Sequence, residues 1–180
     1  VTLLALAAAL AAHAVRAEDA RVLVAAGEVA VVRTASPGAP PVRLVVKAGD
    51  ELRSGDLLVT EADGHTQIRF SDGAIVSLQP RTHFRIEQYR FDAHEQRGYF
   101  ELLRGAMRTV TGAIGKRSRD DYRMRTPTAT VGIRGTLYAA EETVCDPVCH
   151  PGNRPGLRVA VSEGRVAVVN VRTDWRAQAD

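Results

Sequence analysis

The stretch "TATVGIRGTLYAA", residues 128–140, decides the fold of this chain. Its threonine, valine, isoleucine and tyrosine residues are typical of β-strands, yet Arg134 and Gly135 interrupt the apolar run in its middle. An arginine at such a position has three explanations: it takes part in chemistry, it binds a partner, or it closes the fold. The residues on either side, and then the rest of the chain, bear on that choice.

Much of the chain consists of similar β-type segments separated by glycine-containing turns. Apolar and polar residues alternate in TQIRF (66–70), HFRI (83–86) and GAMRTVTG (105–112), which is the pattern of half-buried strands. After the first residues, no segment keeps a helical period over three turns without a glycine or proline. The sequence therefore predicts one all-β domain of about a dozen short strands, and a sandwich, a barrel and a solenoid all fit.

Turn signals mark where these strands end. Asp63-Gly64 and Asp72-Gly73 are dipeptides that tolerate the positive φ angles of tight hairpins. The segment 91–107 contains Gly98 and alternates, so it predicts two strands joined by the loop HEQRG (94–98) rather than a helix.

The first residues have the features of a secretory leader. Residues 2–15 are almost all apolar, but this stretch is shorter than the about 20 residues that cross a bilayer. Val15-Arg16-Ala17 then places small residues at the −3 and −1 positions of a signal-peptidase site. We therefore expect a cleaved signal peptide and a periplasmic protein with no transmembrane anchor after cleavage. The alternative is an apolar first helix of the globular domain.

This interpretation divides the chain into four parts. They are a signal peptide over residues 1–17, a linker over 18–26, the β domain over 27–171 and a C-terminal tail over 172–180.

The charge pattern argues against a nucleic-acid partner. The formal net charge is only +3 and the arginines are scattered along the chain. The one dense run, GKRSRDDYR (115–123), contains two aspartates, and aromatic residues make up only 5% of the chain. Nucleic-acid-binding domains combine a basic stripe with aromatic side chains, so we expect no nucleic acid and a solvated loop here.

The segment CDPVCH (145–150) is the most reactive stretch, and three interpretations remain open. In an exported protein, two cysteines across an Asp-Pro turn predict a local Cys145–Cys149 disulfide. The spacing also approaches a haem-attachment motif, with one residue more than usual and with His150 as the iron ligand. Finally, Cys145, Cys149 and His150 could bind a metal together with one distant histidine, taken from His65, His83 and His94.

Hydrolytic chemistry has no recognisable constellation in this sequence. Ser71-Asp72-Gly73 and Ser162-Glu163-Gly164 are typical turn tripeptides, and the Gly-x-Ser-x-Gly motif does not occur. We therefore expect a non-enzymatic protein without a cofactor.

Taken together, the segments resemble the FecR domain family. A Gly-Asp pair precedes a strand that ends in threonine, an Asp-Gly turn comes next, and a Leu-x-Pro-x-Thr-x-Phe-x-Ile strand follows. The most specific stretch is Thr-Pro-x-Ala-x-Val-Gly-Ile-Arg-Gly-Thr. It is met here by Thr126, Pro127, Ala129, Val131, Gly132, Ile133, Arg134, Gly135 and Thr136. The resemblance extends from about residue 27 to residue 170.

The resemblance implies a periplasmic all-β domain shaped as a twisted β-solenoid-like roll. In the best-known members, this domain receives a signal from an outer-membrane iron-siderophore receptor and passes it to a sigma factor. We expect this chain to depart from that layout, without an anti-sigma segment, a transmembrane helix or a receptor-docking domain after Trp175. We therefore expect a stand-alone exported FecR domain.

Within the motif, Arg134 is predicted to lock a corner of the fold. Gly132 and Gly135 permit a bulge or tight bend, and Arg134 could turn inward and donate hydrogen bonds to carbonyl groups that the bend leaves unpaired. Thr136 could add its hydroxyl group. The alternative is that Arg134 contacts a partner directly.

The leading functional hypothesis is a binding, scaffold or signalling module that contacts another envelope protein. The alternative is a module that associates with polysaccharide or peptidoglycan. An exposed aromatic cluster would favour the glycan, because sugars stack on aromatic faces, whereas an uncovered apolar edge strand would favour a protein.

Intact mass spectrometry of protein purified from the periplasm tests export and the disulfide together. We expect a mass that matches residues 18–180 and is lower by about 2 Da, because a disulfide lacks two thiol hydrogens. Alkylation should add two groups only after reduction. A mass increased by a haem or a metal would instead make CDPVCH the functional site.

Overall fold

The structure is a computed structural model that describes residues 19–36, 38–117, 120–145 and 154–171. These residues form twelve strands and one short helix. The strands are β1 (Ala20–Ala26), β2 (Val29–Arg33), β3 (Val42–Val45), β4 (Glu51–Leu52), β5 (Leu57–Thr60), β6 (His65–Phe70), β7 (Ile75–Leu78), β8 (His83–Phe91), β9 (Gln96–Val110), β10 (Tyr122–Arg125), β11 (Ala129–Thr143) and β12 (Gly156–Asn170). The helix α1 (Ala113–Arg117) precedes β10.

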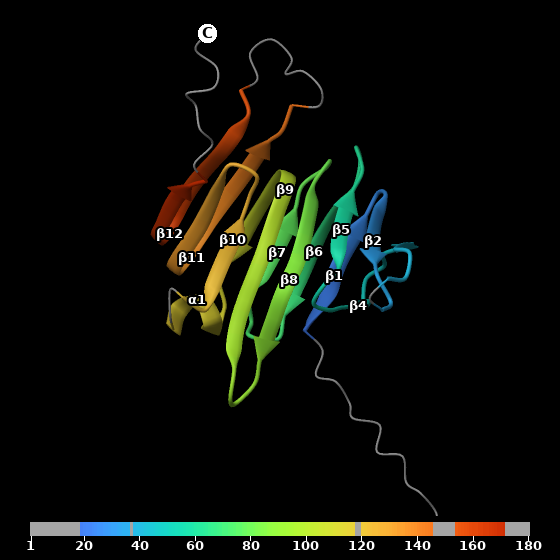
Figure 1. Cartoon of the computed structure of the whole chain (residues 1–180), viewed down its shortest axis with the longest axis horizontal. Coiled ribbons are helices and arrows are strands. Elements are labelled where there is room, and N and C mark those ends of the chain that lie inside the picture. Colours follow the sequence, from blue (N-terminus) through green and yellow to red (C-terminus); the bar gives the residue numbers. More distant parts are fainter. Residues whose placement is uncertain (1–18, 37, 118–119, 146–153, 172–180) are drawn as a thin grey trace, which may run out of the picture.

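All twelve strands belong to one curled sheet (Figure 1). The strand order β3-β2-β5-β8-β9-β7-β6-β1-β4 forms its main path, and β11 joins β9, β10 and β12. Strand β9 holds the sheet together, because its first part pairs with β8 and β10 and its second part pairs with β7 and β11. Strand β12 lies at one end of the sheet, beside β11.

The core fills the inside of the curl and follows the alternation of the strands. In β6, Thr66, Ile68 and Phe70 are buried, while the residues between them face outward or lie half-buried. Phe100 on β9 is the centre of an aromatic cluster, with ring centroids 5.2 Å from Phe70, 5.6 Å from Phe84 and 5.5 Å from Tyr122. Aromatic side chains bury large apolar areas, so this cluster joins strands distant in sequence.

The ladder between β11 and β12 contains a bulge that reverses the alternation. Arg134 pairs with Arg165 and Leu137 with Glu163, so two residues of β11, at 135 and 136, lie opposite Gly164 alone. Before the bulge, odd-numbered residues of β11 are buried, and after it the even-numbered residues from 136 to 142 are buried. Gly135 has a φ of 53°, the left-handed conformation typical of the first bulge residue.

A buried ion pair fixes the Gly-Asp corner before β5. Asp56 is 0% exposed, and Arg33 of β2 donates from Nε to Oδ1 over 2.7 Å and from Nη2 to Oδ2 over 2.6 Å. The backbone N–H of Arg53 also donates to Oδ2. The hydrogen bond to Asp56 raises the pKa of Arg33, and this paired geometry compensates for burying the carboxylate.

The sequence prediction of an all-β domain is confirmed, and the strand predicted to include residues 83–86 is β8, which extends to Phe91. The solenoid-like roll is not confirmed, because the sheet pairs mostly antiparallel and curls as a half-barrel. Three strands, β9, β11 and β12, have 15 residues each and are not short. Gly135, expected at a break, and Gly164, expected in a turn tripeptide, lie inside these continuous strands.

Other boundary predictions need correction. Residues 20–26 are not a linker but strand β1, since Ala20 and Val22 are buried and pair with β6. The loop between β8 and β9 occupies 92–95, and Gly98 pairs inside the sheet. Gly73 has the expected positive φ, whereas Gly64 is required for space, because a Cβ there would lie 2.1 Å from the Glu28 carbonyl oxygen.

The predicted signal peptide and C-terminal tail lie outside the described residues. Among the described residues, no helix has the length and apolarity needed to cross a membrane.

Replacing Gly164 tests the bulge. A Cβ there would lie 2.0 Å from the Gly135 carbonyl oxygen, so an alanine would clash with the backbone as well as strain it. We expect Gly164→Ala to lower the free energy of unfolding by at least about 2 kcal/mol more than an alanine at a glycine that has a positive φ but no such contact. Gly73→Ala is the matched control, since its φ of 87° is close to the 84° of Gly164 and its Cβ would meet no atom within 4 Å. Urea unfolding measures both. Equal losses would show that the close approach is unimportant.

Replacing Arg33 tests the buried ion pair. Arg33→Met leaves the Asp56 carboxylate buried without its cation, so we expect a loss of about 3 kcal/mol in unfolding free energy. Arg43→Met removes an arginine whose carboxylate partners, on Glu28 and Glu61, are exposed, and should cost less than about 1 kcal/mol. Thermal and urea unfolding compare the two variants, and similar costs would contradict a special role for Asp56.

Candidate binding groove and free edge

The Thr-Pro part of the motif builds the turn that starts β11. The Thr126 side-chain oxygen accepts hydrogen bonds from the backbone N–H groups of Thr128 (3.2 Å) and Ala129 (3.0 Å). Pro127 follows Thr126 in this turn, and its fixed φ limits the turn's freedom. Thr128 in turn donates to the Glu142 carboxylate, which is 2% exposed, so the turn is tied to the far end of the same strand.

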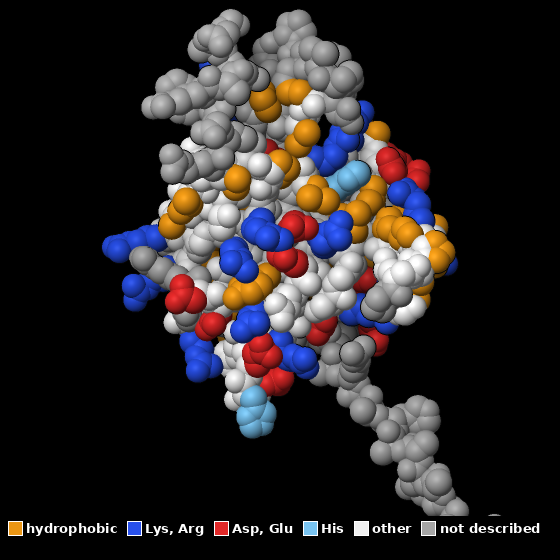
Figure 2. Space-filling model, in the orientation of Figure 1, with side chains coloured by type: hydrophobic (Ala, Val, Ile, Leu, Met, Phe, Trp, Pro, Cys, Tyr) orange, Lys and Arg blue, Asp and Glu red, His pale blue; other side chains and the backbone are white. Residues whose placement is uncertain are grey.

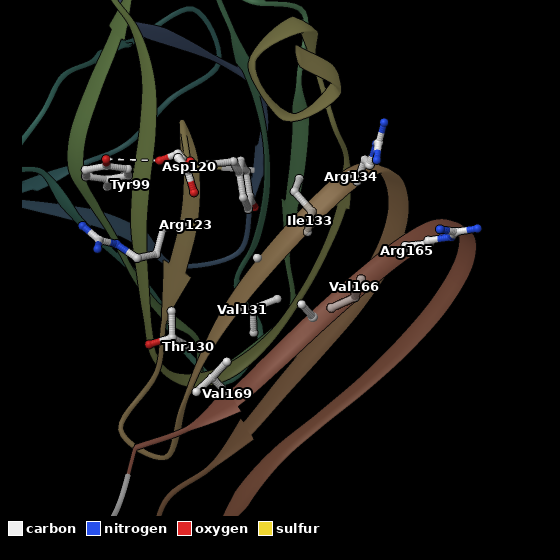
Figure 3. Close-up of a pocket in the computed structure, with 13 residues that line it drawn as sticks. Tyr99, Asp120, Arg123, Thr130, Val131, Ile133, Arg134, Arg165, Val166 and Val169 are labelled. Atoms are coloured by element: carbon white, nitrogen blue, oxygen red, sulfur yellow. Dashed lines mark hydrogen bonds between the residues drawn. The ribbon is translucent and has the colours of Figure 1, made fainter. Parts of the chain in front are cut away.

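The predicted inward lock by Arg134 is wrong. Its side chain is exposed and forms no hydrogen bond with any described residue. The reason is the strand alternation: Val131 and Ile133 face the core, so Arg134 faces the opposite, outer side of the sheet. Figure 3 shows Arg134 extending from the end of this segment of β11 toward solvent.

The predicted roles of the other motif residues are confirmed only in part. Gly135 forms the predicted bulge, whereas Gly132 has no positive φ and lies within a regular stretch of the ladder. Two hydrogen bonds with Thr111 hold the backbone of Thr136. The N–H of Thr136 donates to the Thr111 hydroxyl over 2.9 Å, and the N–H of Thr111 donates to the Thr136 carbonyl. The Thr136 hydroxyl is buried and has no partner among the described residues, so it does not act as predicted.

A groove of about 580 Å³ lies on the outer face beside this motif (Figure 3). Its floor includes Gly132 and Ala167, which oppose each other on β11 and β12. A Cβ at Gly132 would meet no atom within 4 Å, so the missing side chain leaves this floor open. Tyr99 and Arg123 line one side, and Arg134 and Arg165 stand at one end.

Positive charge predominates around the groove. The Arg123 guanidinium lies 4.2 Å from the centre of the Tyr99 ring, a cation–π contact that orients it. Arg134 and Arg165 are direct cross-strand neighbours, and Asp120 is the acidic residue of the lining. Sequence reasoning missed Arg165, Arg123 and Tyr99. Alternation places Arg165, Ala167 and Val169 on one face, but only the register shows which face Arg134 shares.

Two exposed apolar strands form edges of the described sheet. All four residues of β3 are exposed, and β3 pairs with β2 alone. Strand β12 pairs with β11 alone, and Val161, Val168 and Val169 are 46%, 47% and 67% exposed. In the view of Figure 2, hydrophobic side chains lie toward the left and right sides of the molecule, and charged side chains lie between them. This is the feature that favours a protein partner.

Aromatic residues do not form the exposed cluster that would favour a glycan. In the described part of the chain, six of the aromatic side chains are buried (Phe70, Phe84, Tyr89, Phe100, Tyr122 and Tyr138). Tyr99 is half-buried and Arg97 and Arg123 lie over it. Trp175 lies outside the described residues.

The CDPVCH predictions remain predictions, because Cys149 and His150 lie outside the described residues. Cys145 follows the end of β11. His65 and His94 are exposed, and burial together with the charge of Arg104 lowers the pKa of His83. Among the described residues, no group of three or more His, Cys, Asp and Glu side chains could hold a metal ion.

Comparison with known proteins identifies the family. The model of a family described as FecR protein matches residues 56–167, more than half of the 180 residues. No curated protein and no solved structure matches the chain. The matched segment begins at the buried Asp56 and ends at Ala167 in the groove floor, so it includes the motif, the bulge and most of the groove. The chain with this bulged, free-edged sheet belongs to the FecR family.

Proposed function

We propose that this chain is a non-enzymatic FecR domain that binds another protein of the cell envelope and serves there as a signalling or scaffold module. The observation that carries the proposal is the free edge of β12. This 15-residue strand pairs with β11 on one side and with no other described strand on the other. An extended segment of a partner can add to such an edge as a further strand, through backbone hydrogen bonds and side-chain contacts.

The apolar residues on the core side of β12 suit the addition of a further strand. On the core side, Leu157, Val159 and Val166 are half-buried against the core, and Val161 and Val168 remain largely exposed. A strand added at this edge would cover these valines and extend the core outward. Burial of apolar surface supplies the main favourable free energy of such an association.

The place of action is part of the proposal. The leader predicted over residues 1–17 would direct the domain to the periplasm, where FecR family membership supports a role related to envelope signalling. The partner is accordingly sought among envelope proteins.

One added charge should block the edge. Val168 lies on the core side of β12, so Val168→Lys places an ammonium group where an added strand would seat an apolar side chain. Both the domain and its Val168→Lys variant carry a photoreactive residue in place of Val169. We expect the variant to give about tenfold less cross-linked partner in the periplasm, the equivalent of about 1.4 kcal/mol of binding free energy. The cross-linked band, normalised to the amount of domain, is the measured quantity.

Val42→Lys is the matched control, because Val42 is 50% exposed on the edge strand β3. Thermal unfolding by circular dichroism verifies that both variants fold. An unchanged yield with Val168→Lys would refute the β12 interface, and an equal loss with Val42→Lys would show that the effect of the added charge is not specific to β12.

A further inference from the structure

Arg134 and Arg165 form a pair of positive charges without a compensating partner in the described structure. They lie directly opposite each other in the β11–β12 ladder, and both side chains are exposed on the outer face. Like charges at directly opposite positions destabilise a ladder. Neither guanidinium forms an ion pair with a described acidic side chain.

The neighbouring charges do not remove this imbalance. Glu163 lies two residues before Arg165 on β12, but it is paired in register with Leu137 and makes no ion pair with either arginine. The Cγ atom of Lys116 on α1 would lie 3.8 Å from a Cβ at Gly135, so a further basic residue lies beside the bulge. Asp120 belongs to the groove lining, on the side where Arg123 lies. An arrangement of this kind suits an anionic group supplied from outside the described sheet.

A strand added at the free edge of β12 would bring one residue directly opposite Arg165. Cross-strand neighbours share a face of the sheet, so this residue would lie on the outer face, in one row with Arg165 and Arg134. The next residue of the added strand would lie on the core side, beside Val166. Arg134 and Arg165 therefore favour a negative charge at one position of the added strand. Val166 favours an apolar side chain at the next position.

We infer that the partner segment carries an Asp or Glu opposite Arg165, and that its carboxylate is bound by the guanidinium groups of Arg165 and Arg134. This inference rests on the proposed function, because it names the chemistry of the strand that adds to β12. Arginine binds carboxylates through parallel N–H donors, and long side chains on adjacent strands can bracket one anion. In the complex, the carboxylate also reduces the charge repulsion within the arginine pair.

Peptide selection on the mature domain tests the inference. Short random peptides displayed in a library are selected for binding, and the strongest binder is synthesised with its acidic residue intact and with that residue changed to the corresponding amide. We expect the selected peptides to combine an Asp or Glu with an adjacent valine, isoleucine or threonine. Fluorescence anisotropy should show about tenfold weaker binding of the amide peptide, and the difference should shrink at high salt.

Arginine variants assign the effect. With Arg165→Gln, the acidic and amide peptides should bind equally, and Arg134→Gln should reduce the difference between them. Arg69→Gln is the matched control, since Arg69 is also an exposed strand arginine but lies on β6, away from the groove. The unfolding temperature of the Arg134 and Arg165 variants should stay unchanged or rise, because the substitution removes repulsion, whereas a structural lock would lower it.

Each other outcome overturns the inference in a distinguishable way. Selected peptides that lack acidic residues but lose binding with Val168→Lys would refute the carboxylate and leave the proposed edge interface standing. A preference for the acidic peptide that persists in Arg165→Gln would place the carboxylate elsewhere. Failure to select any peptide would contradict both proposals. Arginine-dependent binding of phosphatidylglycerol vesicles in that case would assign the pair to an anionic lipid surface.

Discussion

The close approach of the Gly135 carbonyl to Gly164 is the constraint on which the rest of this structure depends. It allows two residues of β11 to lie opposite one residue of β12, so the alternation reverses within one continuous strand. As a result Ile133 before the bulge and Tyr138 after it are both buried. The same segment is where the neighbour of β11 changes from β10 to β9. The Arg-Gly pair that interrupts the apolar run therefore marks the point at which the buried side of β11 changes from odd-numbered to even-numbered residues.

This constraint also explains why the fold class was predictable and the strand lengths were not. Alternation and β-forming residues indicate strands locally, and 83–91 shows how well they can do so. A glycine with positive φ, however, appears in both a turn and a bulge, and only the partner strand distinguishes them. Gly105, Gly135 and Gly164 each lie inside a 15-residue strand. Likewise, β1 is stabilised by pairing with β6, some 40 residues later in the chain.

The candidate site was predictable in its position but not in its geometry. The motif drew attention to Arg134, and the groove does lie beside it. The direction of its side chain could not be predicted, because it depends on whether odd- or even-numbered residues of β11 face the core. Even-numbered residues face the core only after the bulge, so Arg134 still faces outward. Arg165 stands 31 residues later and becomes its neighbour only through the register of β12. Cross-strand pairs of this kind carry no local sequence signal.

The two longer edges of the sheet are protected to different degrees, and this difference favours β12 as the interaction surface. Strand β3 has four residues, Pro40 and Pro41 precede it, and Arg43 within it forms ion pairs with Glu28 and Glu61. Short length, proline and charge are the devices that keep an edge from pairing. Strand β12 has nearly four times the length and contains no proline, and two of its three charged residues, Glu163 and Arg165, lie beside the bulge near its middle. Apart from Arg158, its flanking segments 157–161 and 166–169 are apolar, and no further described strand pairs with them. In the function proposed above, the partner strand would cover this exposed apolar surface.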